Sequence, residues 1–512
     1  STFGNNVTGT GTLATFNDVT FSGNTINLTG TLRVSGNGRL TIQNGVAATF
    51  GDAWLNSNSA TGTANTVITG GSLTITGAAR DNRDAYFHVT QSGGQVSLGG
   101  LYTGQTDGGN EGGYGGNSTY TLIGGTLTAR AIQGGGGGGW WDRGITLNLG
   151  GGTLRAGASF TMNANTVNLT GVNGNATIDT QAFTLTSNYG FSGAGGLVKN
   201  GPGTLRLNGV SPYAGGTFIN DGTLELGHAT NTLANTGAIT INGAAACLAL
   251  GGNADTVGAV TLKNGSITGT SGVLTATGYA VESGLISAGL AGVGAGLIKS
   301  TAGTVTLGGA NTYTGATQVN EGTLIISGST SATGLIIVSA GGTLGGGGQG
   351  GTVTFADGGT LAPGDGSDSH FEVANLSLTD GSILAFDLGT PLPVGEFIPS
   401  FWYDHVIITG GLTLDGKLRI NPLSNGDTDF GTPIEGDRWL LMTYPAGGGS
   451  LTDHTLDVDT ANSPALSPGL GYQVDTSNDG YVYVVAVAVP EAGTASLLLM
   501  GLALILRKKP RR

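Results

Sequence analysis

Charged and aromatic side chains are scarce in this sequence. Asp, Glu, Lys and Arg together make up 10% of the 512 residues, and aromatic residues make up 6%. An ordinary soluble domain carries about 25% charged residues. The chain still lacks the signature of disorder, which combines many charges with few apolar residues, because 38% of it is hydrophobic. A folded chain is therefore expected.

Cysteine occurs once, as Cys247. A lone thiol cannot form an internal disulfide, and it cannot supply a metal site built from several cysteines. The residue lies in the apolar stretch GAAACLAL, which predicts that Cys247 is a small residue of the core.

Positive charge is sparse except at the C-terminus. The net charge is −13, and five of the 19 Lys and Arg residues lie within positions 507–512. The other basic residues are scattered, so the chain lacks the basic patch that nucleic-acid binding requires. We expect no nucleic-acid partner, and the acidic body fits solubility or cation binding better.

Glycine is abundant, with 100 residues, whereas ordinary chains contain about 7%. Short runs of Leu, Ile and Val alternate with Thr, Asn and Arg, as in Thr146–Leu149 and Thr204–Leu207. Such alternation places the apolar side chains on one face of a strand. Many short strands joined by tight turns are therefore predicted. The tetrapeptide Gly-Gly-Ser/Thr-Leu recurs at 70–73, 124–127, 151–154, 341–344 and 358–361.

Two longer segments repeat each other. Residues 195–227 and 295–328 align at an offset of 100, without a gap over the first 33 residues. A period on this scale is typical of repeat architectures. The matched positions include Lys199 with Lys299, Tyr213 with Tyr313, and 220–224 with 320–324.

Alternation with one apolar face is compatible with a sandwich, a barrel or a solenoid. The strands are short and numerous, and few segments look like the helical crossovers of an α/β sheet. These features favour a parallel β-helix over residues 1–370, with roughly 20 to 25 residues per coil. Its inward side chains should stack in columns that include Leu205, Leu207, Leu224, Val305, Leu307 and Leu324.

Both repeated segments resemble the autotransporter-associated β-strand repeat of bacterial surface proteins. Residues 358–390, which contain GTLAPG, are similar to a passenger segment of the same family. The resemblance implies a right-handed parallel β-helix. Proline and aromatic residues become more frequent after residue 370, so 371–489 is expected to hold further coils that end in a β cap or a small β-domain.

The tail has three parts. Val489, Pro490 and Glu491 precede the apolar run Ala495–Leu506, and a basic cluster follows. A helix over this run would reach about 18 Å, whereas a bilayer core is about 30 Å thick. A short C-terminal hydrophobic helix that is only a marginal anchor is therefore expected, and a buried C-terminal helix is the alternative. The basic residues are Arg507, Lys508, Lys509, Arg511 and Arg512.

This tail resembles the PEP-CTERM sorting signal of secreted proteins in Gram-negative biofilm-forming bacteria, although Ala492 replaces the usual second proline. The resemblance implies processing by an exosortase-type membrane peptidase, after transient membrane contact through residues 493–509. It also implies an export signal upstream of Ser1 and a mature protein that ends near Glu491. We expect residues 490–512 to act as a sorting tail.

The most charged stretch of the body is Ala79–Val89. Asp81, Asp84 and His88 could serve acid–base chemistry, and a solvated loop with local Arg–Asp pairing is the alternative that we favour. Asp365 and Asp368 suggest calcium, but the tandem nonapeptides of calcium-binding β-rolls are absent. No metal site is therefore expected.

Two glycine-rich segments, 102–117 and 134–144, interrupt the alternating pattern. The second contains Trp140 and Trp141, which could stack on sugar rings or fold back over the solenoid. Neither segment is a phosphate loop, because no Gly-Lys-Ser/Thr follows.

The sequence therefore predicts a non-enzymatic extracellular or cell-surface β-solenoid that acts in adhesion or in a biofilm matrix. A carbohydrate-binding or polysaccharide-degrading β-helix is the alternative. Expected partners are other copies of the chain or an extracellular polysaccharide, together with the peptidase that would process the tail. No cofactor and no catalytic residue is expected.

Overall fold

The structure is a computed structural model of the whole chain, and its contacts divide it into two units, residues 1–292 and 293–512. The residues that the structure describes are 2–3, 6–15, 17–23, 25–34, 39–55, 63–81, 86–103, 118–134, 144–364, 370–388, 404–422, 435–446, 449–450, 456–459, 470–477 and 480–489.

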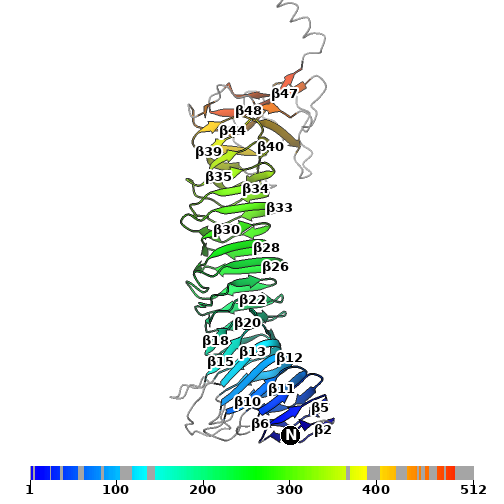
Figure 1. The fold of residues 1–512 in the computed structure, drawn as a ribbon. Coiled ribbons are helices and arrows are strands. Elements are labelled where there is room, and N and C mark those ends of the chain that lie inside the picture. Colours follow the sequence, from blue (N-terminus) through cyan, green and yellow to red (C-terminus); the bar gives the residue numbers. More distant parts are fainter. Residues whose placement is uncertain are drawn as a thin grey trace, which may run out of the picture. The chain divides into compact units, whose positions relative to one another are not determined.

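Unit 1 is a stack of short parallel strands, each of which pairs with a strand one coil further along the chain (Figure 1). Its strands are β1 (Thr2–Phe3), β2 (Val7–Gly9), β3 (Leu13–Thr15), β4 (Val19–Phe21), β5 (Thr25–Leu28), β6 (Thr31–Val34), β7 (Arg39–Ile42), β8 (Ala47–Phe50), β9 (Asp52–Trp54), β10 (Thr63–Ile68), β11 (Ser72–Arg80), β12 (Tyr86–Tyr102), β13 (Ser118–Ala129), β14 (Ile132–Gln133), β15 (Ile145–Leu149), β16 (Thr153–Ala156), β17 (Phe160–Met162), β18 (Thr166–Leu169), β19 (Ala176–Asp179), β20 (Thr184–Ser187), β21 (Phe191–Ser192), β22 (Leu197–Asn200), β23 (Thr204–Leu207), β24 (Thr217–Ile219), β25 (Thr223–Leu226), β26 (Ile239–Gly251), β27 (Ala254–Thr256), β28 (Ala259–Gly269), β29 (Val273–Thr275), β30 (Gly278–Val281), β31 (Gly284–Ile286) and β32 (Gly289–Ala291).

Unit 2 begins with the same kind of parallel stack and ends with antiparallel pairs. Strand β48 pairs antiparallel with both β44 and β47. The strands are β33 (Leu297–Leu307), β34 (Thr317–Ile326), β35 (Leu335–Val338), β36 (Gly342–Gly346), β37 (Gln349–Phe355), β38 (Thr360–Pro363), β39 (His370–Ser377), β40 (Ile383–Leu388), β41 (His405–Ile408), β42 (Leu412–Thr413), β43 (Lys417–Pro422), β44 (Arg438–Thr443), β45 (Gly449–Ser450), β46 (Asp457–Val458), β47 (Leu470–Asp475) and β48 (Tyr481–Ala488).

The expected all-β solenoid is confirmed. Counted over both units, the described strands make about 16 turns of a solenoid of the right-handed type. No helix occurs in the part of the chain that the structure describes, so that part also holds none that could cross a membrane. The domain boundaries at residues 370 and 489 stay predictions.

The core is a set of columns in which one apolar side chain stands on another. In unit 1 one column runs through six strands, from β20 to β31. All six predicted inward residues are fully buried, at 0% exposure. Alternation puts every second side chain into this interior, where removal from water stabilises the stack. The column comprises Leu185, Leu205, Leu224, Leu248, Ile267 and Ile286.

The corresponding column of unit 2 starts with Val305 and Leu324, which are paired in register. It continues through Leu344 and Leu361 to Leu384, and all five side chains are buried. The same period-2 pattern therefore builds the same interior in both units.

The two repeated segments make the same contacts. Tyr213 and Tyr313 are buried, and their hydroxyls lie 2.5 and 2.6 Å from the Oγ1 atoms of Thr217 and Thr317 respectively. Lys199 and Lys299 are both fully buried. The gap-free offset in the sequence thus reflects an equivalent structural unit.

The buried lysine of each segment ties two successive turns together. Lys199 Nζ donates to the carbonyl oxygens of Asn200, Gly201 and Asp221, at 3.1, 2.7 and 2.9 Å. Lys299 Nζ donates to the carbonyls of Thr301 and Glu321. Burial lowers the pKa of Lys199 to about 8, against the opposing attraction of Asp221 and Asp179.

Amide side chains form ladders on the outer face of unit 1. Asn163 donates to Gln133 at 3.4 Å, Asn188 to Asn163 at 2.8 Å and Asn208 to Asn188 at 3.2 Å. Each of these bonds joins one coil to the next. Identical amides stacked in register satisfy one another in this way, as they do in other stacked-strand structures.

The prediction that Cys247 belongs to the core is wrong. Its side chain is partly exposed on the outward face of β26, between the buried Ala246 and Leu248. Its register partners are Thr223 and Ser266, and its Sγ atom lies 3.4 Å from Thr268 Oγ1. Because the residues on both sides of Cys247 are apolar, the sequence alone did not show which residues of this strand face inward.

The tail and the tryptophan pair fall outside the described residues. These residues are Pro490, Glu491, Arg507, Lys508, Lys509, Arg511, Arg512, Trp140 and Trp141. Of the predicted sorting motif the structure describes only Val489, which is 52% exposed.

We expect Leu224→Asp to destabilise the folded chain by several kcal/mol, because it places a carboxylate in the aliphatic column. The measurement is the free energy of unfolding in urea. Thr223→Asp is the matched control, since Thr223 precedes Leu224 and points outward. Equal stability of the two variants would contradict the assignment of the column.

A second prediction concerns pH. Because the folded pKa of Lys199 lies near 8 and the ordinary value is 10.5, the folded chain releases this proton first as pH rises. Between these values the unfolded chain binds more protons, so the free energy of unfolding should increase with pH, by up to about 3 kcal/mol.

The control for this prediction is Lys199→Met, which removes the titrating group while keeping an unbranched apolar stem. Urea unfolding at several pH values from 8 to 10.5 should show a shallower rise for the variant than for the parent chain. Parallel pH profiles would mean that Lys199 is not the group responsible.

Candidate ligand-binding groove

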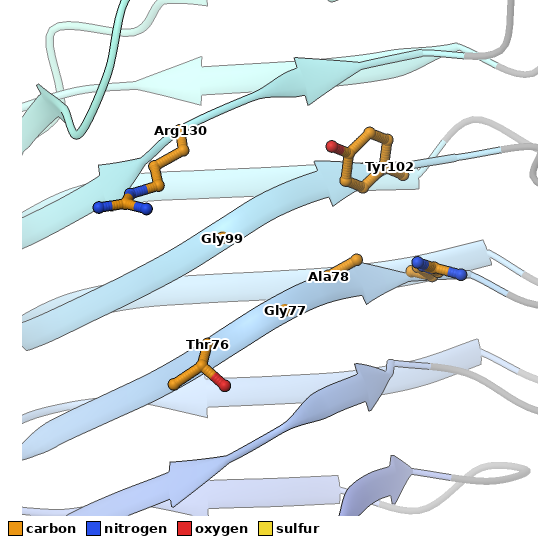
Figure 2. A pocket seen from close by; sticks show the side chains of 7 residues that line it. Thr76, Gly77, Ala78, Gly99, Tyr102 and Arg130 are labelled. Atoms are coloured by element: carbon orange, nitrogen blue, oxygen red, sulfur yellow. The ribbon is translucent and has the colours of Figure 1, made fainter.

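A groove of about 500 Å³ lies on the outer face of unit 1, where β11, β12 and the end of β13 stack on one another (Figure 2). It is open to solvent and lies across consecutive coils. The residues that line it are Thr76, Gly77, Ala78, Arg80, Gly99, Tyr102 and Arg130.

A β-bulge and two glycines create the hollow. Ile75 pairs with Leu98 and Ala78 with Gly100, so β11 has one more residue than β12 at this point. Such bulges bend a strand and change where its side chains point. A Cβ atom on Gly99 would lie 2.3 Å from the carbonyl oxygen of Gly77, so the close approach of the two coils requires glycine there.

Larger side chains lie on either side of this glycine floor. Arg80 and Tyr102 are register partners on adjacent coils, each at the C-terminal end of its strand. The Tyr102 ring lies back over Gly100, where a Cβ would be 2.3 Å from the ring carbon Cε2. Figure 2 shows Tyr102 and Arg130 on opposite sides of Gly99.

Two arginines of unit 1 that lie outside the groove form ion pairs. Arg155 pairs with Asp179 at 3.0 Å, and Arg206 with Glu225 at 3.5 Å. Within the described residues neither Arg80 nor Arg130 forms an ion pair, and the Nε atom of Arg80 is buried without a hydrogen-bond acceptor.

One carboxylate adjoins the floor. Asp52 accepts a hydrogen bond from the backbone N–H of Ala78 at 2.9 Å, and its Oδ1 atom lies where a Cβ on Gly77 would be. This acid is thus engaged in fixing the backbone of the bulge. The groove can offer a ligand guanidinium donors, a phenol ring and, as an acceptor, the Thr76 hydroxyl, which itself donates to the carbonyls of Phe50 and Gly51.

Of the three candidate acid–base residues the structure describes Asp81 and His88, which make separate contacts. Asp81 is buried at 1% exposure, and its Oδ2 atom accepts a hydrogen bond from Ser118 Oγ at 3.0 Å. Ser118 Oγ in turn accepts the backbone N–H of Phe87 at 3.2 Å. The interpretation of Asp81 as part of a solvated loop is wrong, because its carboxylate anchors the start of β12.

His88 lies on the outward side of β12. Its Nδ1 atom contacts Thr119 Oγ1, its ring meets Tyr86 edge-on at 5.5 Å, and burial lowers its pKa. Asp84 falls outside the described residues, as do Asp365 and Asp368. Among the residues that the structure does describe, no three His, Cys, Asp or Glu side chains gather as metal ligands would.

Sequence reasoning missed the groove residues Arg80, Tyr102 and Arg130. One signal was available. Gly77 precedes Arg80 by three positions, and Gly99 precedes Tyr102 by three positions. This pattern, a glycine and then a large side chain three positions later, occurs on two neighbouring coils. The glycines leave a hollow, and the large side chains form its edge.

Residues 197–226 and 297–326 each match the Passenger-associated-transport-repeat. The chain is a β-solenoid with autotransporter-associated repeats. These repeats include Lys199 and Lys299, which supply the cross-turn bonds described above.

A curated relative points the same way. The chain is 29% identical over 295 residues to a protein named adhesin BmaC autotransporter, from Brucella suis biovar 1 (strain 1330). The match covers 51% of this chain and 8% of that protein. The similarity therefore concerns a small part of a much longer molecule.

Proposed function

We propose that this chain is a non-enzymatic β-solenoid that acts in adhesion at the surface of a Gram-negative bacterium or outside it. The observation that carries the proposal is the presence of two passenger-associated repeats in a solenoid similar to part of a protein named as an adhesin. Passengers of autotransporters are exposed on the cell surface, which is where an adhesive solenoid would act.

The use of buried ionisable groups supports a structural role. Lys199 bonds turn carbonyls, Asp81 bonds Ser118, and Asp255 accepts the backbone N–H of Leu233 at 3.1 Å. Each group serves the fold. Acid–base catalysis would instead need titratable side chains that converge on a substrate.

A carbohydrate-binding solenoid is a second candidate, and the groove on unit 1 favours it. Binding and adhesion are compatible, because a surface protein adheres through the ligands that it holds. A matrix role would additionally require chains to associate with one another or with polysaccharide outside the cell.

Attachment is the first test. Native cells that lack this chain should attach to surfaces less than parent cells, and cells that express it again should recover. Adhesion depends on a folded solenoid, so expression of the Leu224→Asp variant should not restore attachment. Unchanged attachment without the chain would contradict the adhesive role.

Catalysis is tested on the purified full chain. Incubation with acidic and neutral polysaccharides should release no new reducing ends. Release of reducing ends by the parent chain would instead support a polysaccharide-degrading function.

We also propose that the tail is a sorting signal. Intact-mass measurement of the protein from native cells should then show an end near Glu491. Replacing Arg507, Lys508, Lys509, Arg511 and Arg512 by Ser should impair processing, because the positive charges stop transfer across the membrane. Native protein that keeps Arg512 and stays in the inner membrane would contradict this proposal.

A further inference from the structure

We propose that the groove of Arg80, Tyr102 and Arg130 binds a carboxylated saccharide, such as the uronic-acid units of an acidic polysaccharide. This inference deepens the adhesive function and rests on it for its biological meaning, since it names the chemistry of the partner.

The charge of the groove favours an anionic ligand. The chain as a whole carries a net charge of −13, yet this groove places two guanidinium groups that lack ion-pair partners within the described residues. Arginine binds carboxylates through paired, charge-assisted hydrogen bonds. The Nε atom of Arg80 is buried without an acceptor, so no group of the described residues compensates its charge there.

The carboxylate of Asp52 does not cancel this charge. Its Oδ1 atom accepts the backbone N–H of Ala78, so part of its capacity as an acceptor is already used. The residues that line the groove include two arginines and no carboxylate. A cation site would need several oxygen ligands, and among the described residues no three acidic, histidine or cysteine side chains come together.

Among anionic ligands, the shape of the groove favours a saccharide. The floor is glycine backbone, the Tyr102 ring supplies an aromatic surface, and the Thr76 hydroxyl, which donates to the carbonyls of Phe50 and Gly51, can still accept a hydrogen bond. Sugars present apolar C–H faces and many hydroxyls, which match a ring with polar neighbours. A small inorganic anion would use the arginines and leave the rest of the groove unfilled.

The spacing of the two arginines favours a chain of sugars over a single sugar. Arg80 ends β11 and Arg130 follows β13, so the two arginines belong to coils separated by the coil of Tyr102. Two steps between stacked coils amount to roughly 10 Å along the stacking direction. Each arginine can then bind the carboxylate of a different sugar, as successive uronic-acid units of a chain would allow.

The test is calorimetric titration of the purified full chain with trigalacturonate at low ionic strength. We expect the double variant Arg80→Gln/Arg130→Gln to weaken binding by about tenfold or more. Tyr102→Leu should weaken it by about fivefold, since the aromatic surface is lost. The matched control, Arg33→Gln/Arg39→Gln, removes two exposed arginines outside the groove and should change the affinity less than about twofold.

Two further probes separate the ligand classes. Methyl-esterified trigalacturonate has the same sugars without the charge and should bind about tenfold more weakly. Inorganic phosphate at the same concentration should not displace trigalacturonate. No binding of trigalacturonate, equal binding of the ester, displacement by phosphate, or a double variant that binds like the parent would each overturn the inference.

Folding and function are controlled separately. The melting temperature of each variant is measured, and if the double variant fails to fold, Arg130→Gln alone decides, because Arg130 is exposed. Cells whose groove variants attach like the parent would refute the groove as the adhesive site while leaving adhesion standing. Trigalacturonate binding by a chain that does not affect attachment would refute the adhesive function and leave the groove standing.

Discussion

The ladder of backbone hydrogen bonds between one coil and the next is the constraint on which the rest of this structure depends. Parallel pairing fixes the register, and the register decides which side chains meet, as when Leu205 stands on Leu185 and beneath Leu224. A fully buried leucine contributes about 1.5–3 kcal/mol relative to an exposed one, so each column reinforces the ladder that aligns it. Polar groups follow the same register, since the Asn188 amide meets its neighbour only because the coils are aligned.

This dependence explains why much of the fold could be predicted from the sequence. Period-2 alternation and glycine-bounded runs identified the strands, and the offset of 100 identified equivalent units whose Lys199 and Lys299 do occupy equivalent positions. Which residues of a strand face inward was harder to predict. Cys247 has apolar neighbours on both sides, and only its pairing with Thr223 shows that it faces outward. Asp81 looked solvated because its acceptor role depends on Ser118, which lies 37 residues further along the chain.

The groove could not be predicted from the sequence, for a related physical reason. Its position is set by a single extra residue in β11, which shifts the pairing between Ile75 and Ala78. Local sequence preferences do not specify where such a shift falls, because its free energy depends on contacts with the coils on either side. Arg80, Tyr102 and Arg130 are ordinary surface residues until the coils bring them together. Trp140 and Trp141, the glycan-contact candidates of the sequence, lie outside the described residues.

The equivalence of the two repeated segments has a consequence for how such a chain can change in length. The two faces of each coil that contact its neighbours are similar. When a whole coil is gained or lost, the two coils that then become neighbours can therefore still pair. A change of one residue inside a strand would instead turn leucines outward and threonines inward. Genetic changes that duplicate complete coils should therefore be tolerated, and the solenoid can grow by copying its own parts, as the paired lysines Lys199 and Lys299 suggest that it has done.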